Sequence, residues 1–219
     1  MPRLLFEKTG SAVWISHLDL MRLFQRAFKR AGLSLTHTQG FNPRPSVSIA
    51  LPLSVGVESR CELLDFDLDG ETVSCDEICR RLNNALVEGV KVLEVYEQGR
   101  KLRDLSLLHC AVSLEYDGCI SVQDRQQLEQ LFAREEVTVP KRTKNGMQDQ
   151  NIIPMIRKLH IEQGDTHTLT IDAVVCCQNP TLNPMLLITA IELYCPALKP
   201  DFAKCRRLEI LDQNENVFR

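Results

Sequence analysis

Several motifs that define common classes of protein are missing from this 219-residue sequence. No apolar run approaches the ~20 residues that a helix needs to cross a bilayer. The sequence has no Gly-x-Gly-x-x-Gly or Gly-Lys-Ser/Thr loop for phosphates, no nucleophile elbow and no zinc-hydrolase helix. It also lacks any Cys-x-x-Cys pair. These absences argue against a transmembrane helix, the common nucleotide-binding loops, zinc ribbons and thioredoxin-type redox chemistry.

An excess of positive charge is missing as well. Lys and Arg number 26 against 29 Asp and Glu, which gives a net charge of -3. No global field therefore draws the molecule to nucleic acid, and any anion-binding surface must be a local patch. The hydrophobic fraction of 44% and charged fraction of 25% are typical of a soluble globular protein. Glu7 lies where a signal peptide would be apolar, which predicts a cytoplasmic location with no membrane contact.

Cysteine is plentiful, with nine residues that lie mostly inside apolar segments. We interpret them as reduced, buried thiols that act as small hydrophobic side chains. Cys75 and Cys79 share a helix face, but no nearby His or Cys completes a metal set. We therefore expect no metal and no cofactor to be bound by this chain.

Hydrophobic periodicity and turn residues predict the secondary structure of the first half of the chain. Strands are expected at 3–8, 47–51, 62–68 and 90–96, with helices capped by Ser16 and Ser74 and ended by Gly32 and Gly89. The order strand, helix, strand, strand, helix, strand is that of a ferredoxin-like module.

The second half repeats this order approximately. Strands are predicted at 107–116 and 205–211, a hairpin at 152–161 and 167–175 around a turn at 163–165, and helices begin at Ser121 and Asn183. One extra or broken strand is expected near 137–147. The prediction is an α+β fold of two tandem ferredoxin-like (βαββαβ) modules, at 1–98 and 105–219, with a polar linker between them.

The first predicted helix carries four cations, Arg22, Arg26, Lys29 and Arg30, opposite its apolar stripe. Lys and Arg side chains on one face suit phosphate oxygens. An ordinary solvated helix face is the plainer interpretation of such a charge run. Arg44 in the following loop, and Arg60 beyond it, enlarge the patch if they fold toward the helix.

The loop after this helix reads Gln39-Gly40-Phe41-Asn42-Pro43-Arg44-Pro45. Two prolines fix φ, and Gly40 permits a positive φ, so the loop should hold a defined shape. The amides of Gln39 and Asn42 either contact a ligand or cap their own loop. Phe41 is either a stacking surface for a base or a core anchor, and we predict a core anchor because most Phe residues are buried.

His17 occupies the first position of the same helix, where the positive helix end favours the neutral imidazole. It is a candidate general acid or base, and the sequence leaves open an arrangement in which His37, near the loop after the same helix, faces it across a cleft. The alternative is a histidine that joins the helix cap and fills a half-buried niche.

Three further motifs have plainer explanations. Asp65, Asp67 and Asp69 alternate along one strand and share a face, but Asp69-Gly70 is better explained as a turn than as part of a metal site. The basic segment 141–146 is interpreted as a solvated loop. Nothing indicates the exposed, low-pKa thiol that a redox role for Cys176-Cys177 would need.

A chain of short motifs also carries a family resemblance: Ile15-Ser16-His17-Leu18-Asp19, Arg22, Arg26-Ala27, Arg30-Ala31-Gly32-Leu33, Gln39-Gly40-Phe41-Asn42-Pro43, Leu51-Pro52-Leu53 and Gly56-Val57-Glu58-Ser59. Together they resemble the radical-SAM-linked family of uncharacterised bacterial proteins. The resemblance implies a B12-binding radical SAM protein as partner, either as a separate chain or as a fusion with this one at its C-terminus. It implies no catalytic activity. The family usually has His where this chain has Arg44, which argues against a metal or acid–base role for the loop.

Three functions fit these observations. The first is a non-catalytic accessory protein that holds an RNA or ribonucleoprotein substrate, or docks the radical SAM partner, through the basic helix and the 39–45 loop. The second is a metal-independent RNA-processing enzyme, with His17 as acid or base and Arg22 or Arg26 stabilising the phosphorane charge. The third is a small-molecule-binding or structural scaffold. The enzyme requires His17 to share one concavity with the arginines.

Overall fold

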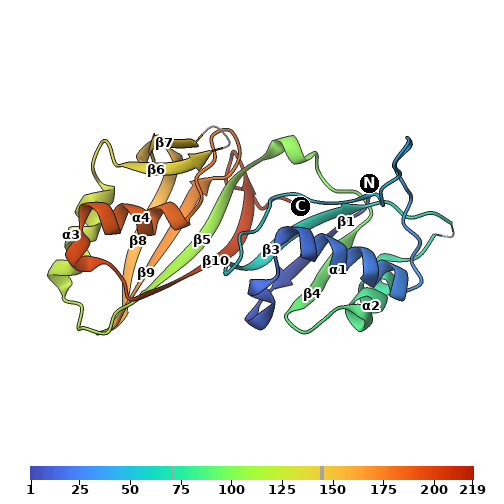
Figure 1. Cartoon of the computed structure of the whole chain (residues 1–219), viewed down its shortest axis with the longest axis horizontal. Coiled ribbons are helices and arrows are strands. Elements are labelled where there is room, and N and C mark those ends of the chain that lie inside the picture. The colour runs from blue at the N-terminus through green and yellow to red at the C-terminus, as the bar shows by residue number, and fades with distance from the viewer. Residues whose placement is uncertain (71, 144–145) are drawn as a thin grey trace. The chain divides into compact units, whose positions relative to one another are not determined.

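The fold is α+β, and the computed structural model describes residues 1–70, 72–143 and 146–219 (Figure 1). The chain divides into two compact units. Unit 1 is Met1–Asp104 together with Phe218–Arg219, and unit 2 is Leu105–Val217. Within the described residues, no helix is both long enough and apolar enough to cross a membrane.

Unit 1 follows the predicted order of elements. They are β1 (Arg3–Lys8), the 3-10 helix η1 (Gly10–Trp14), α1 (His17–Arg30), β2 (Val47–Ile49), β3 (Glu58–Phe66), α2 (Cys75–Ala85), β4 (Val90–Tyr96) and η2 (Leu102–Asp104). All the strand pairs are antiparallel, and the order across the sheet is β4-β1-β3-β2. Strand β1 is therefore central, although it comes first in the chain.

Helix α1 forms where the sequence predicts it, for identifiable reasons. The Ser16 hydroxyl accepts the Asp19 N–H at 3.2 Å and so caps the first turn. At the other end Gly32 has φ +67°, and the Leu33 N–H reaches the Phe28 carbonyl at 2.9 Å. A glycine in this left-handed conformation ends helices because it has no Cβ to strain.

The core of unit 1 is the apolar stripe of α1 packed on the sheet. Phe24 is fully buried, and its ring lies 4.7 Å from that of Phe6 on β1, edge to face. Phe28 packs against Phe66 of β3 at 5.1 Å, and Ile78 and Leu82 of α2 complete the same cluster. Burial of such aromatic side chains is the main force that holds α1 on the sheet.

Unit 2 begins with β5 (Leu105–Glu115), α3 (Val122–Phe132) and a two-stranded sheet of β6 (Thr138–Thr143) and β7 (Gly146–Asn151). It continues with η3 (Ile153–Met155), β8 (Ile156–Asp165), β9 (Thr168–Cys176), α4 (Met185–Tyr194), η4 (Pro196–Leu198) and β10 (Phe202–Asp212). The main sheet of this unit has the order β10-β5-β9-β8, again antiparallel. When β6, β7 and the 3-10 helices are left out, the order of strands and α-helices and the order across the sheet match those of unit 1.

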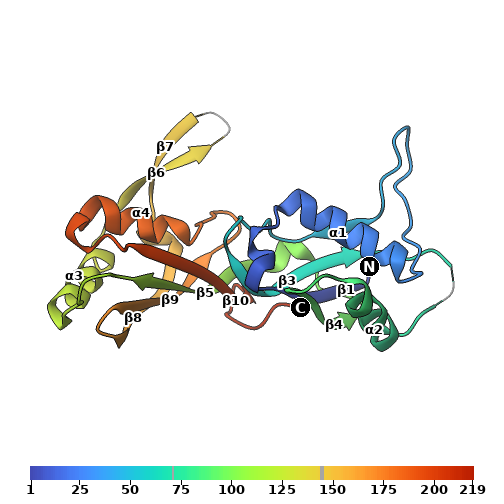
Figure 2. The ribbon, with the colours of Figure 1, turned by 60° about the horizontal axis from the view of Figure 1, so that its bottom comes forward.

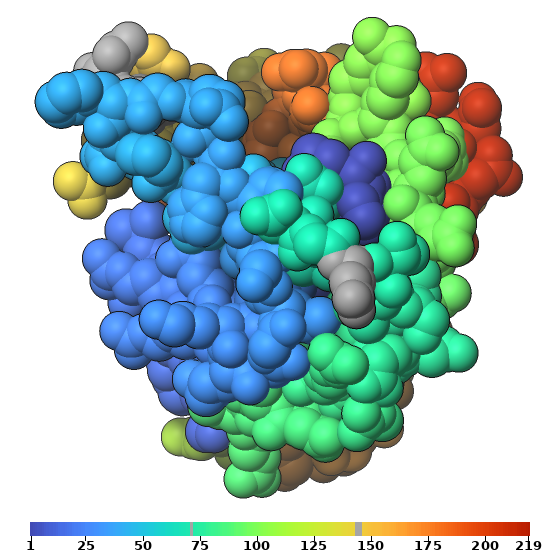
Figure 3. All heavy atoms as spheres, turned by 90° about the vertical axis from the view of Figure 1, so that its right-hand side faces the viewer, coloured from blue at the N-terminus to red at the C-terminus, as the bar shows by residue number. Residues whose placement is uncertain are grey.

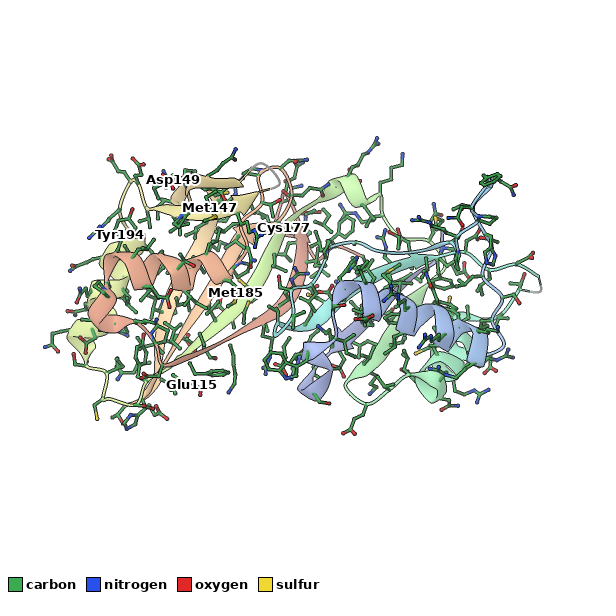
Figure 4. All side chains as sticks on the ribbon, viewed as in Figure 1. Glu115, Met147, Asp149, Cys177, Met185 and Tyr194 are labelled. Atoms are coloured by element: carbon green, nitrogen blue, oxygen red, sulfur yellow. The ribbon has the colours of Figure 1, made fainter. Side chains whose placement is uncertain are left out.

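The β6–β7 hairpin is the extra element that the sequence indicates near 137–147. It lies beside α4, where Figure 4 labels Met147 and Asp149 on the hairpin and Tyr194 at the end of the helix. The Tyr194 hydroxyl donates to the Thr138 carbonyl and accepts the Thr138 N–H, both at 3.0 Å. The expected basic loop 141–146 is instead partly strand, because 141–143 belong to β6; Lys144 and Asn145 lie outside the described residues.

The turn predicted at 163–165 is displaced in the structure. Strand β8 continues through Asp165, and the turn is at 166–167. The Asp165 carboxylate accepts the His167 N–H at 2.8 Å and the Thr168 hydroxyl at 2.9 Å. An Asp side chain that bonds the backbone two residues later sets up a turn at that point, so Asp165, and not Gly164, fixes where the chain reverses.

Candidate functional site

The cations of α1 lie on its outer face, as the spacing predicts, but they have different neighbours. Arg22 pairs with Asp19 one turn earlier, at 2.9 Å, and both are well exposed. Arg26 and Lys29 are exposed, and neither makes an ion pair with any other residue that the structure describes. Hydrogen bonds to the Asp19 carboxylate, the larger effect from the Ser16 hydroxyl and the smaller from Arg22, hold its pKa below the usual value. Arg26 and Lys29 are thus the cations best placed to meet an external anion.

Arg30 has a structural role that the sequence did not indicate. Its guanidinium donates to the Ala85 carbonyl at 2.6 Å. Ala85 is the last residue of α2, and its carbonyl is one of those that a helix end leaves without a partner. Arg30 therefore ties the end of α2 to the end of α1. It also lines a hollow of about 600 Å³ with Arg81 and Asn84.

The loop after α1 is an irregular hairpin, residues 36–46, which we call the loop hairpin. Its stem is an antiparallel bridge between His37 and Pro45, with the Thr38 N–H donating to the Arg44 carbonyl at 2.9 Å. In the other direction, the Arg44 N–H donates to the Thr38 hydroxyl at 3.0 Å. The loop hairpin extends beyond the helices and sheet of its unit in Figure 2, and Figure 3 shows its blue atoms as a projecting lobe.

The base of the loop hairpin is attached to the sheet through Thr36. The Thr36 N–H donates to the Asp67 carbonyl at 3.0 Å, and its hydroxyl donates to the Asp67 carboxylate at 3.1 Å. The Ser46 N–H donates to the Thr36 carbonyl at 2.8 Å. These bonds fix the direction in which the loop hairpin leaves the sheet.

The tip of the loop hairpin corrects one prediction. Phe41 is not a core anchor; its exposed fraction is 110%. Gln39, Gly40 and Asn42 beside it are exposed too, and Gly40 has φ +139°, which a side chain would strain. The prediction was wrong because burial frequencies describe average Phe residues, whereas a turn built from Gly, Asn and Pro carries its side chains away from the core. An exposed aromatic ring next to amide side chains can stack on a planar ligand.

A groove of about 400 Å³ joins the two candidate elements, and we call it the Lys29 groove. Lys29 and Gln25 of α1 form one wall, and His37 and Pro45 of the loop hairpin stem contribute to the other. The segment between them, 32–35, forms the remainder. One cation of the basic helix and the proline-containing loop thus line one hollow.

Gln25 is the residue in this groove that the sequence did not single out. It precedes Lys29 by four residues, so the two side chains lie on the same face of α1. That spacing was the available signal, but a polar residue on an outer helix face is too common to indicate a site by itself.

His17 lies away from this groove. At about 1.5 Å of rise per residue, Lys29 is about 18 Å further along the helix axis. Arg22 and Arg26 lie about 140–180° round the helix from His17, at about 100° per residue. The Nδ1 atom of His17 is buried, and no residue that the structure describes hydrogen-bonds to it. The structure therefore does not bring His17 together with either the arginines or His37.

The aspartates of β3 and the segment after it also have structural partners. Asp65 receives two bonds from the guanidinium of Arg3, at 2.6 and 3.1 Å, and Arg3 is almost completely buried. Asp67 holds Thr36 as described above. Among the described residues, no group of three His, Cys, Asp or Glu side chains lies close enough to hold a metal ion.

The cysteines are free thiols, most of them buried or half-buried, and Cys119 is exposed. Burial raises the pKa of Cys177 to about 12 and that of Cys205 to about 11. A thiol with a raised pKa is a poor nucleophile because the thiolate is the reactive form. These two residues are part of the packing of unit 2.

The chain belongs to a family described as uncharacterized proteins conserved in bacteria (DUF2344), whose model matches residues 2–184. No curated protein matches it.

The comparison with solved structures finds matches at low sequence identity. A chain in a crystal structure of a Cbf5–Nop10–Gar1 complex is 9% identical, with a TM-score of 0.54, over 95% of this chain and 48% of that one. This chain therefore spans about half the length of that one. An unknown protein from Galdieria sulphuraria is 11% identical, with a TM-score of 0.27, over 94% and 96% of the two chains. The match to the chain of the Cbf5–Nop10–Gar1 complex shows a similarity of fold alone.

Proposed function

We propose that this protein is a non-catalytic accessory protein that binds RNA, or the RNA part of a ribonucleoprotein, through the outer face of α1 and the loop hairpin. The observation that carries the proposal is the Lys29 groove, where a helix cation and the stem of the loop hairpin share one hollow. Arg26 extends the positive charge along the helix, and Arg44 adds a cation in the loop hairpin. This is the local patch that a protein with a net negative charge needs in order to attract a polyanion.

The shape of the site favours single-stranded RNA. The ring of Phe41 is completely exposed at the tip of the loop hairpin, which leaves its face open to an unpaired base. The bases of a duplex are stacked inside the helix and cannot reach such a ring. Lys29 and Arg26 would then contact the phosphates, and the amides of Gln39 and Asn42 would contact base edges.

The same geometry supports binding over catalysis. An RNA-cleaving enzyme of the kind considered above needs His17 within reach of the phosphate that the arginines hold. His17 lies on the side of α1 away from the cations, with one ring nitrogen buried.

A partner protein is the second part of the proposal. The motif resemblance indicates a B12-binding radical SAM protein, and we propose that this chain presents the RNA to it. The fold similarity adds only that a chain of similar fold occurs in a complex of several proteins.

We also propose that units 1 and 2 are ferredoxin-like modules in tandem, corresponding to the predicted domains 1–98 and 105–219. The support is the recurrence of strand, helix, strand, strand, helix, strand, with the first strand central and paired to the third and fourth in each case. The β6–β7 hairpin is then an insertion in the second module.

The test measures binding of a fluorescein-labelled 20-nucleotide oligouridine, chosen as a probe with no secondary structure. We expect the double variant Arg26→Gln, Lys29→Gln to bind about tenfold more weakly or worse. The slope of log Kd against log salt should fall by about 1.4, since each phosphate contact to a single strand contributes about 0.7. The matched control is the double variant Lys199→Gln, Lys204→Gln, which removes two charges from exposed residues of unit 2.

Two results would overturn the proposal. One is that wild-type protein shows no salt-dependent binding to the oligouridine. The other is that the Arg26→Gln, Lys29→Gln variant and the control bind equally well. For the partner, we expect the tagged chain to retain the radical SAM protein when both are purified from the native cell; its absence from the purified material would remove that part of the proposal.

A further inference from the structure

We propose that the free edge of β8, together with the end of α3, is a docking site where an extended, acidic and apolar segment of a partner protein adds to the sheet of unit 2 as a further strand. This site is in unit 2, and it does not depend on the RNA proposal. Its elements are β8 and the last turn of α3, with Ile153 between them.

The first observation is the edge itself. Strand β8 is ten residues long and ends the strand order of its sheet (Figure 1). In the described part of the chain it pairs with β9 alone. Every second residue of such a strand directs its N–H and C=O groups away from its neighbour, where they form a template for another strand. Of the two outer strands of unit 1, β2 has three residues and β4 has seven, so both are shorter than β8.

The second observation is a hollow of about 380 Å³ beside this edge. It is lined by Glu129, Phe132 and Ala133 of α3 and its cap, by Ile153, and by six consecutive residues of β8, 156–161. Side chains of a strand alternate between the two faces of the sheet. The pairing with β9 is irregular between Ile156 and Lys158, but it is regular from Lys158 to Ile161. Because residues of both faces line the hollow, it extends along the strand's edge and is not confined to one face. An exposed strand edge with a pocket beside it is where several peptide-binding domains accept an added strand.

The third observation identifies the occupant. Arg157 and Lys158 are exposed along the edge, which favours acidic side chains in the added strand, whereas the exposed His160 lies 3.6 Å from the Glu162 carboxylate. Phe132 and Ile153 are half-buried and offer apolar contact at the helix side of the hollow. Cations on an edge strand also discourage the edges of two copies from pairing, because like charges would meet. The same charges that disfavour a second copy therefore select a partner of opposite charge.

Lys158 already pairs with Glu215 in the chain, and Glu129 lies 3.6 Å from Arg125. Arg157 makes no ion pair with any residue in the described part of the chain. We therefore expect Arg157 to dominate the charge preference and Lys158 to add less.

The experiment selects peptides from a phage-displayed library of random dodecapeptides on the full-length chain. We expect the selected peptides to alternate apolar with acidic residues. On binding, hydrogen exchange should slow at alternate amides of residues 157–161, because only the outward N–H groups gain a partner. The same peptides with alternate backbone amides N-methylated should bind at least tenfold more weakly, because they cannot pair along one edge.

Two variants connect the peptides to this surface. Ala133→Trp fills the hollow from an exposed position at the end of α3, so it should fold normally and reduce affinity about tenfold or more. Arg157→Glu should reduce affinity for the acidic peptides by a similar factor. The matched control is Lys91→Glu, on the exposed surface of β4 in unit 1, which should leave affinity unchanged.

The proposal fails if no peptide is enriched, or if the enriched peptides protect amides outside β8 and α3. It also fails if Ala133→Trp binds them as well as the wild-type chain does. If sedimentation shows a dimer that Ala133→Trp abolishes, a second copy occupies the edge and the proposed partner is wrong. If the oligouridine probe, and no peptide, shifts the exchange of 157–161, the surface belongs to RNA.

Discussion

The first helix of each unit is followed by a different projection, although the two helices hold the same place in their units. Helix α1 leads to the loop hairpin before β2, and α3 leads to the β6–β7 hairpin before β8. Both projections extend beyond the sheet and helices of their own unit in Figure 2. One projection is stabilised by turn residues and side-chain bonds, and the other by a regular two-stranded ladder.

The comparison shows where this fold accepts additions. The connection between the first helix and the following strand leaves the end of the helix at the surface, so extra residues there need not disturb the core. In unit 1 the addition carries an exposed ring at its tip, and its stem lines the Lys29 groove beside α1. Unit 2 uses it to cover part of α4, and the Tyr194 hydroxyl anchors it there.

The largest expected effect tests whether α1 and α3 are equivalent anchors. Phe24 of α1 and Leu128 of α3 are both fully buried. Phe24→Ala should lower the free energy of unfolding by about 3–5 kcal/mol, and Leu128→Ala by about 2–5 kcal/mol, because each leaves a cavity. Urea unfolding followed by circular dichroism measures both. The control Leu18→Ala, at an exposed position of α1, should change stability by less than about 0.5 kcal/mol.

Hydrogen exchange resolves where each variant acts. Phe24→Ala should increase exchange within unit 1, and Leu128→Ala within unit 2. A variant that loosened neither its own helix nor the strands beneath it would show that the two helices are not equivalent anchors.

A smaller effect on stability is expected at the N-termini of α1 and α3, where the two helices are capped differently. In α3 the Ser121 hydroxyl and the Asp124 carboxylate cap each other's backbone N–H groups, at 3.2 and 2.8 Å. In α1 the Ser16 hydroxyl caps the Asp19 N–H, and no side chain among the described residues caps the Ser16 N–H in return. Ser121→Ala should therefore destabilise by about 1–2 kcal/mol and Ser16→Ala by about 1 kcal/mol or less. Equal losses, measured by thermal unfolding, would contradict this ranking.

The cap of α3 also makes the stability of the protein depend on pH. Two hydrogen bonds to the Asp124 carboxylate lower its pKa below the usual value; the Ser121 backbone N–H has the larger effect and the Ser121 hydroxyl the smaller. A carboxyl with a lowered folded-state pKa stabilises the protein above its unfolded-state pKa, about 4, and this contribution disappears as pH falls through the folded value. Asp124→Asn should therefore reduce the loss of stability on acidification below about pH 4.

The smallest effect on stability is expected at the tip of the loop hairpin. Phe41→Ala should change the free energy of unfolding by less than about 0.5 kcal/mol, because the ring is fully exposed and contributes nothing to the core. The same variant should weaken oligouridine binding by a factor of about 5–150, the range for the loss of one stacked base. If Phe41→Ala unfolded more easily and bound RNA normally, the ring would be part of the packing after all.

Much of the fold could be predicted from the sequence because it depends on local patterns. The caps at Ser16, Ser74 and Ser121 and the end of α1 at Gly32 follow from short motifs whose geometry is set within a few residues. The extra strand near 137–147 was also indicated, but not its pairing with β7, because pairing requires a second segment and a register.

The candidate site was readable only in part. Helical spacing placed Arg22, Arg26 and Lys29 on the outer face of α1, as observed. It did not show that Arg30 caps α2, that Gln25 lies in the groove, or that Phe41 is exposed. Each of these depends on segments that meet only after the chain folds.

The sequence by itself determined the α+β class, the helix starts and the position of four cations on one helix, because hydrophobic periodicity and capping act over a few residues. Tertiary structure alone decided which of those cations faces a hollow and which holds another helix. It also decided that the loop hairpin projects outward and that β8 ends its sheet. Those outcomes depend on contacts between residues far apart in the chain, and no local pattern specifies them.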